Sequence, residues 1–305
     1  MCNLLTLKDW NPEVIQKILL NAGSMKAARN TSYWAICPWL NSLEGLNIVL
    51  YFEKPSLRTH LTFDIAIKKL GGNAVYFDNS KQMGREPDTD IARNITRWAD
   101  GIVARVYKQE TLETFANEGN IPVINALSDM YHPCQALADY MTMLELVSKE
   151  AKDLKVAYIG EPNNVSNSLM IMASKLNIKE FAICCPASMS PDFLLLNECK
   201  KVSTGKIYVT AFPEDLKDYD VIYCDTWFSM GDTTNSHMDK EKILQPYQVN
   251  QDLLDKLNIP YVLHCLPCHR GQEITDDVIE KHPEIYQLAE NRLWTEMSVL
   301  YYIFR

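Results

Sequence analysis

The sequence predicts an α/β protein of two domains, each a mostly parallel sheet flanked by helices, with long helices joining them. Short apolar runs alternate with segments of helical periodicity along the whole chain. The runs are apolar enough for strands that are buried on both faces and covered by helices. The length of 305 residues is also natural for two domains and long for one.

The first half of the chain shows this alternation clearly. The runs LNIVLYF and GIVARV are typical of buried strands, and polar loops with helical patterns follow them. We expect strands at 46–52, 74–77, 101–106 and 122–127, with helices at 61–70, 90–98 and 111–116.

The second half repeats the same rhythm, beginning with the apolar run KVAYIG. This repetition predicts a second sheet covered by its own helices. We expect strands at 155–160, 181–185, 206–212, 221–227 and 261–266, with helices at 168–176, 191–202, 249–257 and 276–281.

A long helical pattern at 134–148 lies between the halves and follows Pro133, a residue that suits a first helical turn. It predicts a connector between a domain at 1–140 and a domain at 141–305. The chain ends with another helical pattern at 290–304. We expect the final helix, about 289–305, to pack back on the first domain.

Composition limits the classes of partner. The formal net charge of -9 disfavours a nucleic-acid partner, which requires a basic face. Every apolar stretch is shorter than the roughly 18 residues of a membrane span, and the N-terminus lacks a secretory pattern. The nine cysteines show no regular spacing. We therefore expect reduced thiols, no membrane partner and a cytoplasmic location.

The string FEKPSLRTH follows the first predicted strand and contains Ser56, Arg58 and Thr59. Two hydroxyls, one guanidinium and the free N–H groups of a helix start form a cradle for a phosphate. A capped helix with a surface arginine is the alternative. Arg105 ends another predicted strand, where a buried cation needs either a bound anion or a structural carboxylate.

The string HPCQ opens the connector helix and places His132 one turn before Gln135. A histidine at a helix start favours its neutral form and can donate one hydrogen bond to a carbonyl oxygen. The Gln135 amide can reach the same small ligand. A helix cap with a histidine satisfied in the core is the alternative reading.

Two polar loops follow predicted strands of the second half. Asn164 follows KVAYIG, where the glycine fingerprint of a dinucleotide site is missing, so nicotinamide and flavin binding are disfavoured. Asp225 opens DTWFSMG and suits an ammonium group. Turn chemistry explains both loops equally well on local grounds.

The string HCLPCHRG spaces Cys265 and Cys268 like half of a zinc site. No second ligand pair exists elsewhere, so we predict no metal. Cys265 is better interpreted as a thiol at a strand end that faces a ligand, or as simple packing.

The order of these strings along nearly the whole chain resembles the aspartate/ornithine carbamoyltransferase family. They are FEKPSLRTH, Arg105, HPCQ, the Asn163-Asn164 pair, DTWFSMG, HCLP and AENR at 289–292. The SMG and HCLP strings resemble the ornithine-specific members. An aspartate-specific member is expected to carry a Pro-Arg after the matching histidine-proline and a basic loop in place of SMG, and neither is here.

The resemblance implies a role for each matching residue. Arg58, Arg105, His132 and Cys265 are expected to act in catalysis. Gln82 is expected to reach carbamoyl phosphate from a neighbouring subunit, which implies a homotrimer. The other expected carbamoyl phosphate contacts are Ser56, Leu57, Thr59, Pro133, Cys134, Gln135, Leu266 and Arg292, and the expected ornithine contacts are Asn164, Asp225, Ser229 and Met230.

The function that the resemblance implies is transfer of the carbamoyl group from carbamoyl phosphate to the side-chain amine of L-ornithine. The products are L-citrulline and phosphate, and no cofactor is required. A carbamoyltransferase for putrescine or an acylated ornithine is the alternative. A catalytically silent homologue is the rival from another class, and the full set of polar residues argues against it.

Overall fold

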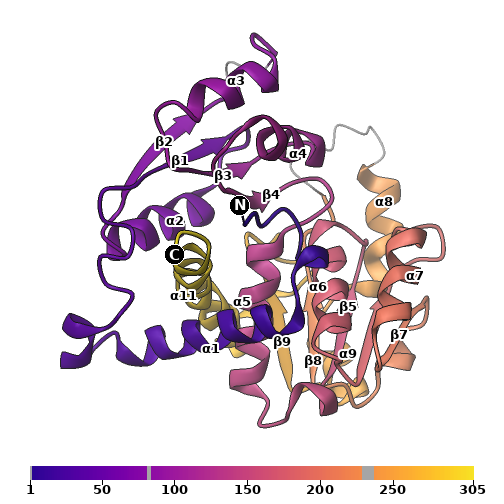
Figure 1. Cartoon of the computed structure of the whole chain (residues 1–305). Coiled ribbons are helices and arrows are strands. Elements are labelled where there is room, and N and C mark those ends of the chain that lie inside the picture. Colours follow the sequence, from indigo (N-terminus) through magenta and orange to yellow (C-terminus); the bar gives the residue numbers. More distant parts are fainter. Residues whose placement is uncertain (1, 81–83, 229–236) are drawn as a thin grey trace. The chain divides into compact units, whose positions relative to one another are not determined.

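The computed structural model describes residues 2–80, 84–228 and 237–305, which form two compact units. Unit 1 comprises Met1–Met141 with Glu290–Arg305, and unit 2 comprises Thr142–Ala289. Each unit contains one parallel sheet (Figure 1). The predicted fold class, two domains with parallel sheets flanked by helices, is confirmed.

The sheet of unit 1 has the strand order β2-β1-β3-β4, and every neighbouring pair is parallel. Parallel pairing places the carboxyl ends of its strands along one edge of the sheet. The strands are β1 Asn47–Phe52, β2 Asn73–Asp78, β3 Gly101–Arg105 and β4 Val123–Leu127.

Helices from both ends of the chain complete unit 1. Ser298 in α11 donates a hydrogen bond to the Ile18 carbonyl of α1 at 2.8 Å, and Lys26 Nζ donates to Asn291 Oδ1 at 2.7 Å. The helices that belong wholly to unit 1 are α1 Pro12–Ala28, α2 Leu57–Lys69, α3 Asp88–Ile95 and α4 Gln109–Glu118, with short 3-10 turns at Leu7–Asp9 and Ser32–Ile36. Two further helices, α5 Pro133–Leu146 and α11 Glu284–Ile303, belong to it in part, because unit 1 ends at Met141 and resumes at Glu290.

The sheet of unit 2 has the strand order β7-β6-β5-β8-β9, again parallel throughout. Its strands are β5 Lys155–Ile159, β6 Glu180–Cys184, β7 Lys206–Thr210, β8 Val221–Cys224 and β9 Tyr261–His264. The helices are α6 Asn164–Lys175, α7 Phe193–Val202, α8 His237–Leu244, α9 Gln251–Leu257 and α10 Asp276–Lys281, with 3-10 turns at Ala151–Asp153, Pro213–Leu216 and Gln245–Tyr247.

The predicted elements occur near their expected places, with some differences. Helix α2 begins at Leu57 rather than 61, because Ser56 caps it with its side chain. Helices α6 and α11 also begin earlier than predicted, at Asn164 and Glu284. Helices α1 and α8 were not predicted. Strand β2 lies at the edge of its sheet and is mostly exposed, so the expectation of strands buried on both faces is wrong for β2.

None of the helices in the described ranges 2–80, 84–228 and 237–305 has the length and apolar character needed to cross a membrane.

Two glycines, one tightly packed and one with open space beside it, give a paired test of the packing in the fold. A Cβ on Gly205 meets the Ile178 carbonyl oxygen at 1.8 Å, and because that oxygen is backbone it cannot swing away. We predict that Gly205→Ala lowers the free energy of unfolding by about 1–3 kcal/mol, the usual cost of overpacking. Urea denaturation followed by circular dichroism measures the change.

Gly23 in α1 serves as the control, because a Cβ there meets nothing within 4 Å. Gly23→Ala should raise stability by about 0.5–1 kcal/mol through helix propensity. Equal effects of the two substitutions would contradict the packing described around Gly205.

Candidate functional site

Polar side chains gather at the carboxyl ends of the strands in each unit. In unit 1 they follow β1, β3 and β4, and in unit 2 they follow β5, β8 and β9. Neighbouring parallel strands end at the same sheet edge, so side chains far apart in sequence meet there. Each of these edges is a candidate ligand site of its own unit.

The N-terminus of α2 forms the first element of the unit 1 site. Ser56 is its N-cap and accepts a hydrogen bond from the Thr59 amide at 3.3 Å. Leu57 is exposed, Arg58 is half-buried and Thr59 is buried. The remaining free amides and the helix dipole favour an anion at this point.

Arg292 joins α11 to this helix start. Its Nη2 donates to Thr59 Oγ1 and to Glu296 Oε1, each at 3.0 Å. Arg292 and Glu296 are both buried. A buried guanidinium held by a hydroxyl and a carboxylate has a fixed direction, which suits recognition of an anion.

Arg105 ends β3 and is buried. Glu53 ties the ends of β1 and β3 together, because its amide donates to the Arg105 carbonyl at 2.9 Å and its carboxylate accepts from the Tyr107 amide at 2.8 Å. Burial raises the pKa of Glu53, partly offset by that amide. These two hydrogen bonds of Glu53 fix the backbone on either side of Arg105.

His132 directly precedes α5 and is buried. Burial holds the pKa of its imidazole well below the usual range, and the charges of Arg292 and Arg105 lower it further. The imidazole is therefore neutral at physiological pH and can donate one hydrogen bond.

The first turn of α5 carries two more of the predicted residues. Gln135 Nε2 donates to Asp139 Oδ1 at 2.8 Å, while its buried Oε1 has no hydrogen-bond partner among the described residues. The Cys134 thiol donates to the Asn125 carbonyl, and burial raises its pKa. Cys134 is thus a neutral packed thiol, whereas Gln135 presents an unused acceptor.

Lys54 is a cation that the sequence interpretation did not single out. Burial lowers the pKa of its ammonium group, and repulsion from Arg105 lowers it further. Its Nζ lies 4.2 Å from the centroid of the Tyr107 ring. Its place in the strand-to-helix loop of FEKPSLRTH was the available signal.

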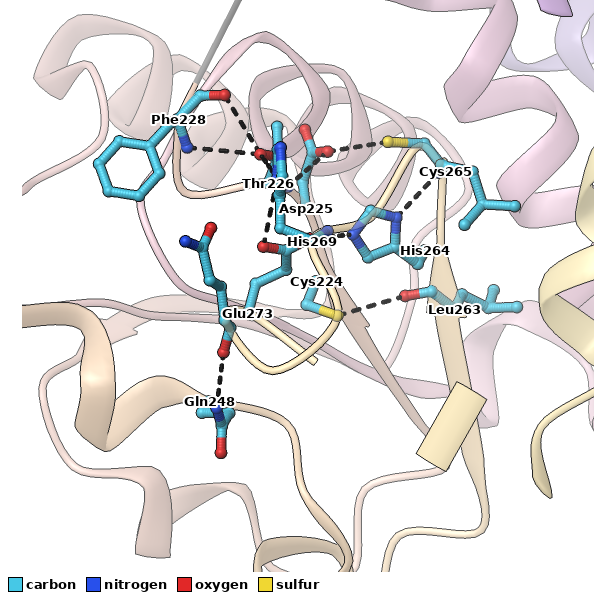
Figure 2. A network of polar contacts seen from close by, with 12 residues as sticks. Cys224, Asp225, Thr226, Phe228, Gln248, Leu263, His264, Cys265, His269 and Glu273 are labelled. Carbon is cyan, nitrogen blue, oxygen red and sulfur yellow. Dashed lines mark hydrogen bonds and ion pairs between the residues drawn. The ribbon is translucent and has the colours of Figure 1, made fainter. Parts of the chain in front are cut away.

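Asp225 is the centre of the unit 2 site. It follows β8 and accepts three hydrogen bonds: from Asn163 Nδ2 at 2.7 Å, from the Thr226 amide at 2.8 Å and from the Cys265 thiol at 2.9 Å. Figure 2 shows the bond from Cys265. Asn163 caps α6 through a capping box with Ser166. The sequence interpretation chose Asn164 instead, the first residue of α6.

A buried acid supports the loop that carries Cys265. His264 Nδ1 accepts from the Leu266 amide at 2.8 Å, and His264 Nε2 lies 3.3 Å from Glu273 Oε1. Glu273 also accepts from the His269 amide at 2.5 Å. Figure 2 shows this network beside Asp225. The loop is therefore fixed by a carboxylate that the sequence interpretation did not predict.

One metal-like cluster arises here, because ligand atoms of Asp225, His264 and Cys265 lie within 4.8 Å of one another. Both His264 nitrogens face other partners, the Leu266 amide and Glu273. The Cys265 thiol is used as a donor to Asp225. Each of the three side chains therefore has contacts with other protein groups.

Three predicted site residues, Gln82, Ser229 and Met230, lie outside the described residues. Of the others, the structure places Pro133 as the first residue of α5 and Leu266 next to Cys265. Leu266 has φ 53°, a left-handed conformation unusual for a leucine.

The two sites differ in the charge they present. The unit 1 site offers guanidinium groups and a helix start, groups that are suited to an anion. The unit 2 site offers the carboxylate of Asp225, which is suited to an ammonium group. The chain therefore carries one candidate site for a small anion and one candidate site for an amine.

Comparison with known families identifies both halves. Residues 3–145 match the carbamoyl-P binding domain of aspartate/ornithine carbamoyltransferase. Residues 152–303 match the Asp/Orn binding domain of the same enzymes.

Curated relatives match over the full length. An ornithine carbamoyltransferase from Moritella abyssi is 46% identical over 306 residues, covering 98% of this chain and 98% of that protein. Another from Shewanella oneidensis is 41% identical over 310 residues and covers 100% of both chains.

Solved structures of ornithine carbamoyltransferases are also similar to this chain. Ornithine carbamoyltransferase from Pyrococcus furiosus gives a TM-score of 0.88 at 39% identity, covering 98% of this chain and 95% of that chain. An anabolic ornithine carbamoyltransferase from Campylobacter jejuni gives 0.90 at 33% identity and covers 99% of both.

Proposed function

The chain belongs to the aspartate/ornithine carbamoyltransferase family, and on that premise we infer that it transfers the carbamoyl group of carbamoyl phosphate to the side-chain amine of L-ornithine. The products are L-citrulline and phosphate. The observation that carries this function is the presence, in one chain, of a buried arginine site in unit 1 and the Asp225 site in unit 2. The two sites match the opposite charges of the two substrates.

We propose that unit 1, the domain predicted at 1–140, binds carbamoyl phosphate. The phosphate group is assigned to the start of α2, where Ser56, Leu57, Arg58 and Thr59 supply amides, hydroxyls and a guanidinium. Arg105 and Arg292 supply further charge, and both are buried, which strengthens their attraction for an anion.

The carbamoyl end is assigned to the start of α5. The neutral imidazole of His132 donates to the carbonyl oxygen. The free Oε1 of Gln135 accepts from the carbamoyl amide, which gives that buried atom its missing partner. Pro133 and Cys134 line this turn through their backbone, since the Cys134 thiol is already bonded to Asn125.

Ornithine is assigned to unit 2, which lies within the domain predicted at 141–305. The α-ammonium group binds the Asp225 carboxylate, which Asn163 and Cys265 orient through hydrogen bonds. Asn164 is assigned to the amino-acid end of the substrate, as are Ser229 and Met230, two residues outside the described ranges.

The side-chain amine must lose a proton before it attacks, and a free lysine-like amine has a pKa of about 10.4. A cationic environment lowers that pKa. Attack on the carbonyl carbon gives a tetrahedral oxyanion, and Arg58, Arg105 and His132 are assigned to stabilise it and the leaving phosphate. Cys265 and Leu266 are assigned to the reacting groups. The reaction needs no cofactor.

We propose that the chain forms a homotrimer in which Gln82 reaches the site of a neighbouring subunit. Strand β2 lies at the sheet edge, and Val75, Tyr76 and Phe77 are exposed on it. Leu57, Leu61 and Ile65 of α2 are also exposed. An apolar edge strand of this kind is normally covered by a partner, which supports self-association of unit 1.

We further propose a cytoplasmic role in arginine biosynthesis. The nine cysteines are all free thiols, as expected in a reducing compartment. A similar solved structure comes from an anabolic ornithine carbamoyltransferase.

A citrulline assay tests the function directly. With carbamoyl phosphate as donor, we predict turnover of L-ornithine and none of aspartate. Putrescine and an α-acylated ornithine should be at least about tenfold slower, because putrescine lacks the α-carboxylate and the acylated ornithine lacks the α-ammonium group that Asp225 binds. Faster turnover of putrescine or of the acylated ornithine would replace this function with the alternative amine, and no turnover of any amine would reject it.

The division between units gives a second prediction. Arg58→Gly should raise the KM for carbamoyl phosphate on the order of 10- to 100-fold, because one charged contact is lost. Asp225→Ala should raise the KM for ornithine by a similar factor. Initial rates with each substrate varied in turn measure both constants.

Asp225→Asn is the matched control, since it keeps the shape of the side chain and removes its charge. This variant should raise the KM for ornithine nearly as much as Asp225→Ala does. A loss of carbamoyl phosphate affinity in either Asp225 variant, equal to the loss for ornithine, would contradict the assignment of one substrate to each unit.

Subunit exchange tests the proposed shared site. Gln82→Ala and Arg58→Gly are each expected to be weakly active alone. Mixed trimers, formed by denaturing and refolding the two variants together, should regain part of the activity because some sites combine intact Gln82 and Arg58. Refolding each variant separately is the control. An unchanged rate in mixtures shown by light scattering to be trimeric would contradict a site shared between subunits.

A further inference from the structure

Glu296 is a buried acid that the proposed reaction does not use. It lies in α11 with no exposed surface and accepts a hydrogen bond from Arg292 Nη2 at 3.0 Å. The same Arg292 nitrogen donates to Thr59 Oγ1 at 3.0 Å. Glu296 is therefore linked through one arginine to the helix start assigned to phosphate.

Burial of a carboxylate normally carries a large cost, which a paired cation only partly offsets. Here burial raises the pKa of Glu296 to about 7, against the opposing effects of Arg292 and Thr62. Both the ionised and the neutral form are thus populated near physiological pH.

The groups that face Glu296 do not titrate in this range. Arg292 on its own helix stays charged at all relevant pH values. Burial raises the pKa of Cys134 on α5, so this thiol stays neutral. Thr62 on α2 does not ionise, and His132, beside Arg292, is already neutral. Among these neighbours, Glu296 alone changes charge near neutrality.

We propose that Glu296 is a positioning residue that sets the charge of the anion site: its ionised carboxylate offsets the charge of Arg292 and weakens carbamoyl phosphate binding, while its protonation strengthens binding. The inference rests on the proposed function, because it takes carbamoyl phosphate as the ligand of unit 1. Either form keeps an oxygen that accepts from Arg292, so the direction of the guanidinium is preserved.

Glu296→Gln separates charge from position. The amide oxygen of glutamine still accepts from Arg292, but the group never ionises. At pH 6 the variant and the wild-type enzyme should have similar KM values for carbamoyl phosphate. At pH 8 the wild-type KM should exceed that of the variant on the order of 3- to 10-fold, the effect of one nearby charge.

The ratio of the two KM values is the quantity to plot against pH, because the titrations of both substrates cancel in it. It should rise with a midpoint near pH 7, and kcat should change little. Glu296→Leu, which removes the acceptor as well, should raise the KM at both pH values. A flat ratio while both enzymes make citrulline would overturn the role of Glu296, whereas absence of citrulline from the wild-type enzyme would instead reject the proposed function.

Thermal unfolding gives a readout that is independent of catalysis. A carboxyl whose pKa is raised by folding contributes stability that is fully present below its unfolded value of 4.5 and is lost as pH rises through about 7. The Tm of Glu296→Gln relative to wild type should therefore be higher at pH 8 than at pH 4.5. A constant difference in Tm would contradict ionisation of this buried group.

Discussion

Buried positive charge is the constraint on which the unit 1 site depends. Arg105 and Arg292 are both buried, and their charges act together on His132. Cations in such a place are costly unless anions or hydrogen-bond acceptors hold them. The polypeptide supplies Thr59 and Glu296 for Arg292. In the proposed function, carbamoyl phosphate brings a further negative charge to this site.

The unit 2 site presents a negative charge, and neighbouring groups hold this charge in place through hydrogen bonds. Asp225 is held by Asn163, by a backbone amide and by the Cys265 thiol, so its carboxylate has a fixed position. The loop of Cys265 is in turn braced by His264 and Glu273. A pre-oriented carboxylate can bind an ammonium group without first losing side-chain freedom.

The sequence predicted the strands and the polar residues at their ends well, because hydrophobic periodicity and the polarity of a loop are both properties of the local sequence. Arg105 and Asp225 were expected at strand ends and lie there. The prediction from sequence missed the start of α2, because the capping role of Ser56 depends on backbone geometry. Glu296 and Glu273 were missed because an acid in a helix or loop usually faces solvent, and only distant partners such as Arg292 and His264 explain their burial.

The most direct measurement of the central claim is a crystal structure of the protein grown with carbamoyl phosphate. We expect phosphate density at the N-terminus of α2, within hydrogen-bond distance of the free backbone amides of this helix start and of the Arg58 and Arg105 guanidinium groups, with the carbamoyl group against His132 and Gln135. Phosphate bound elsewhere, with Arg105 directed to a protein carboxylate instead, would contradict it.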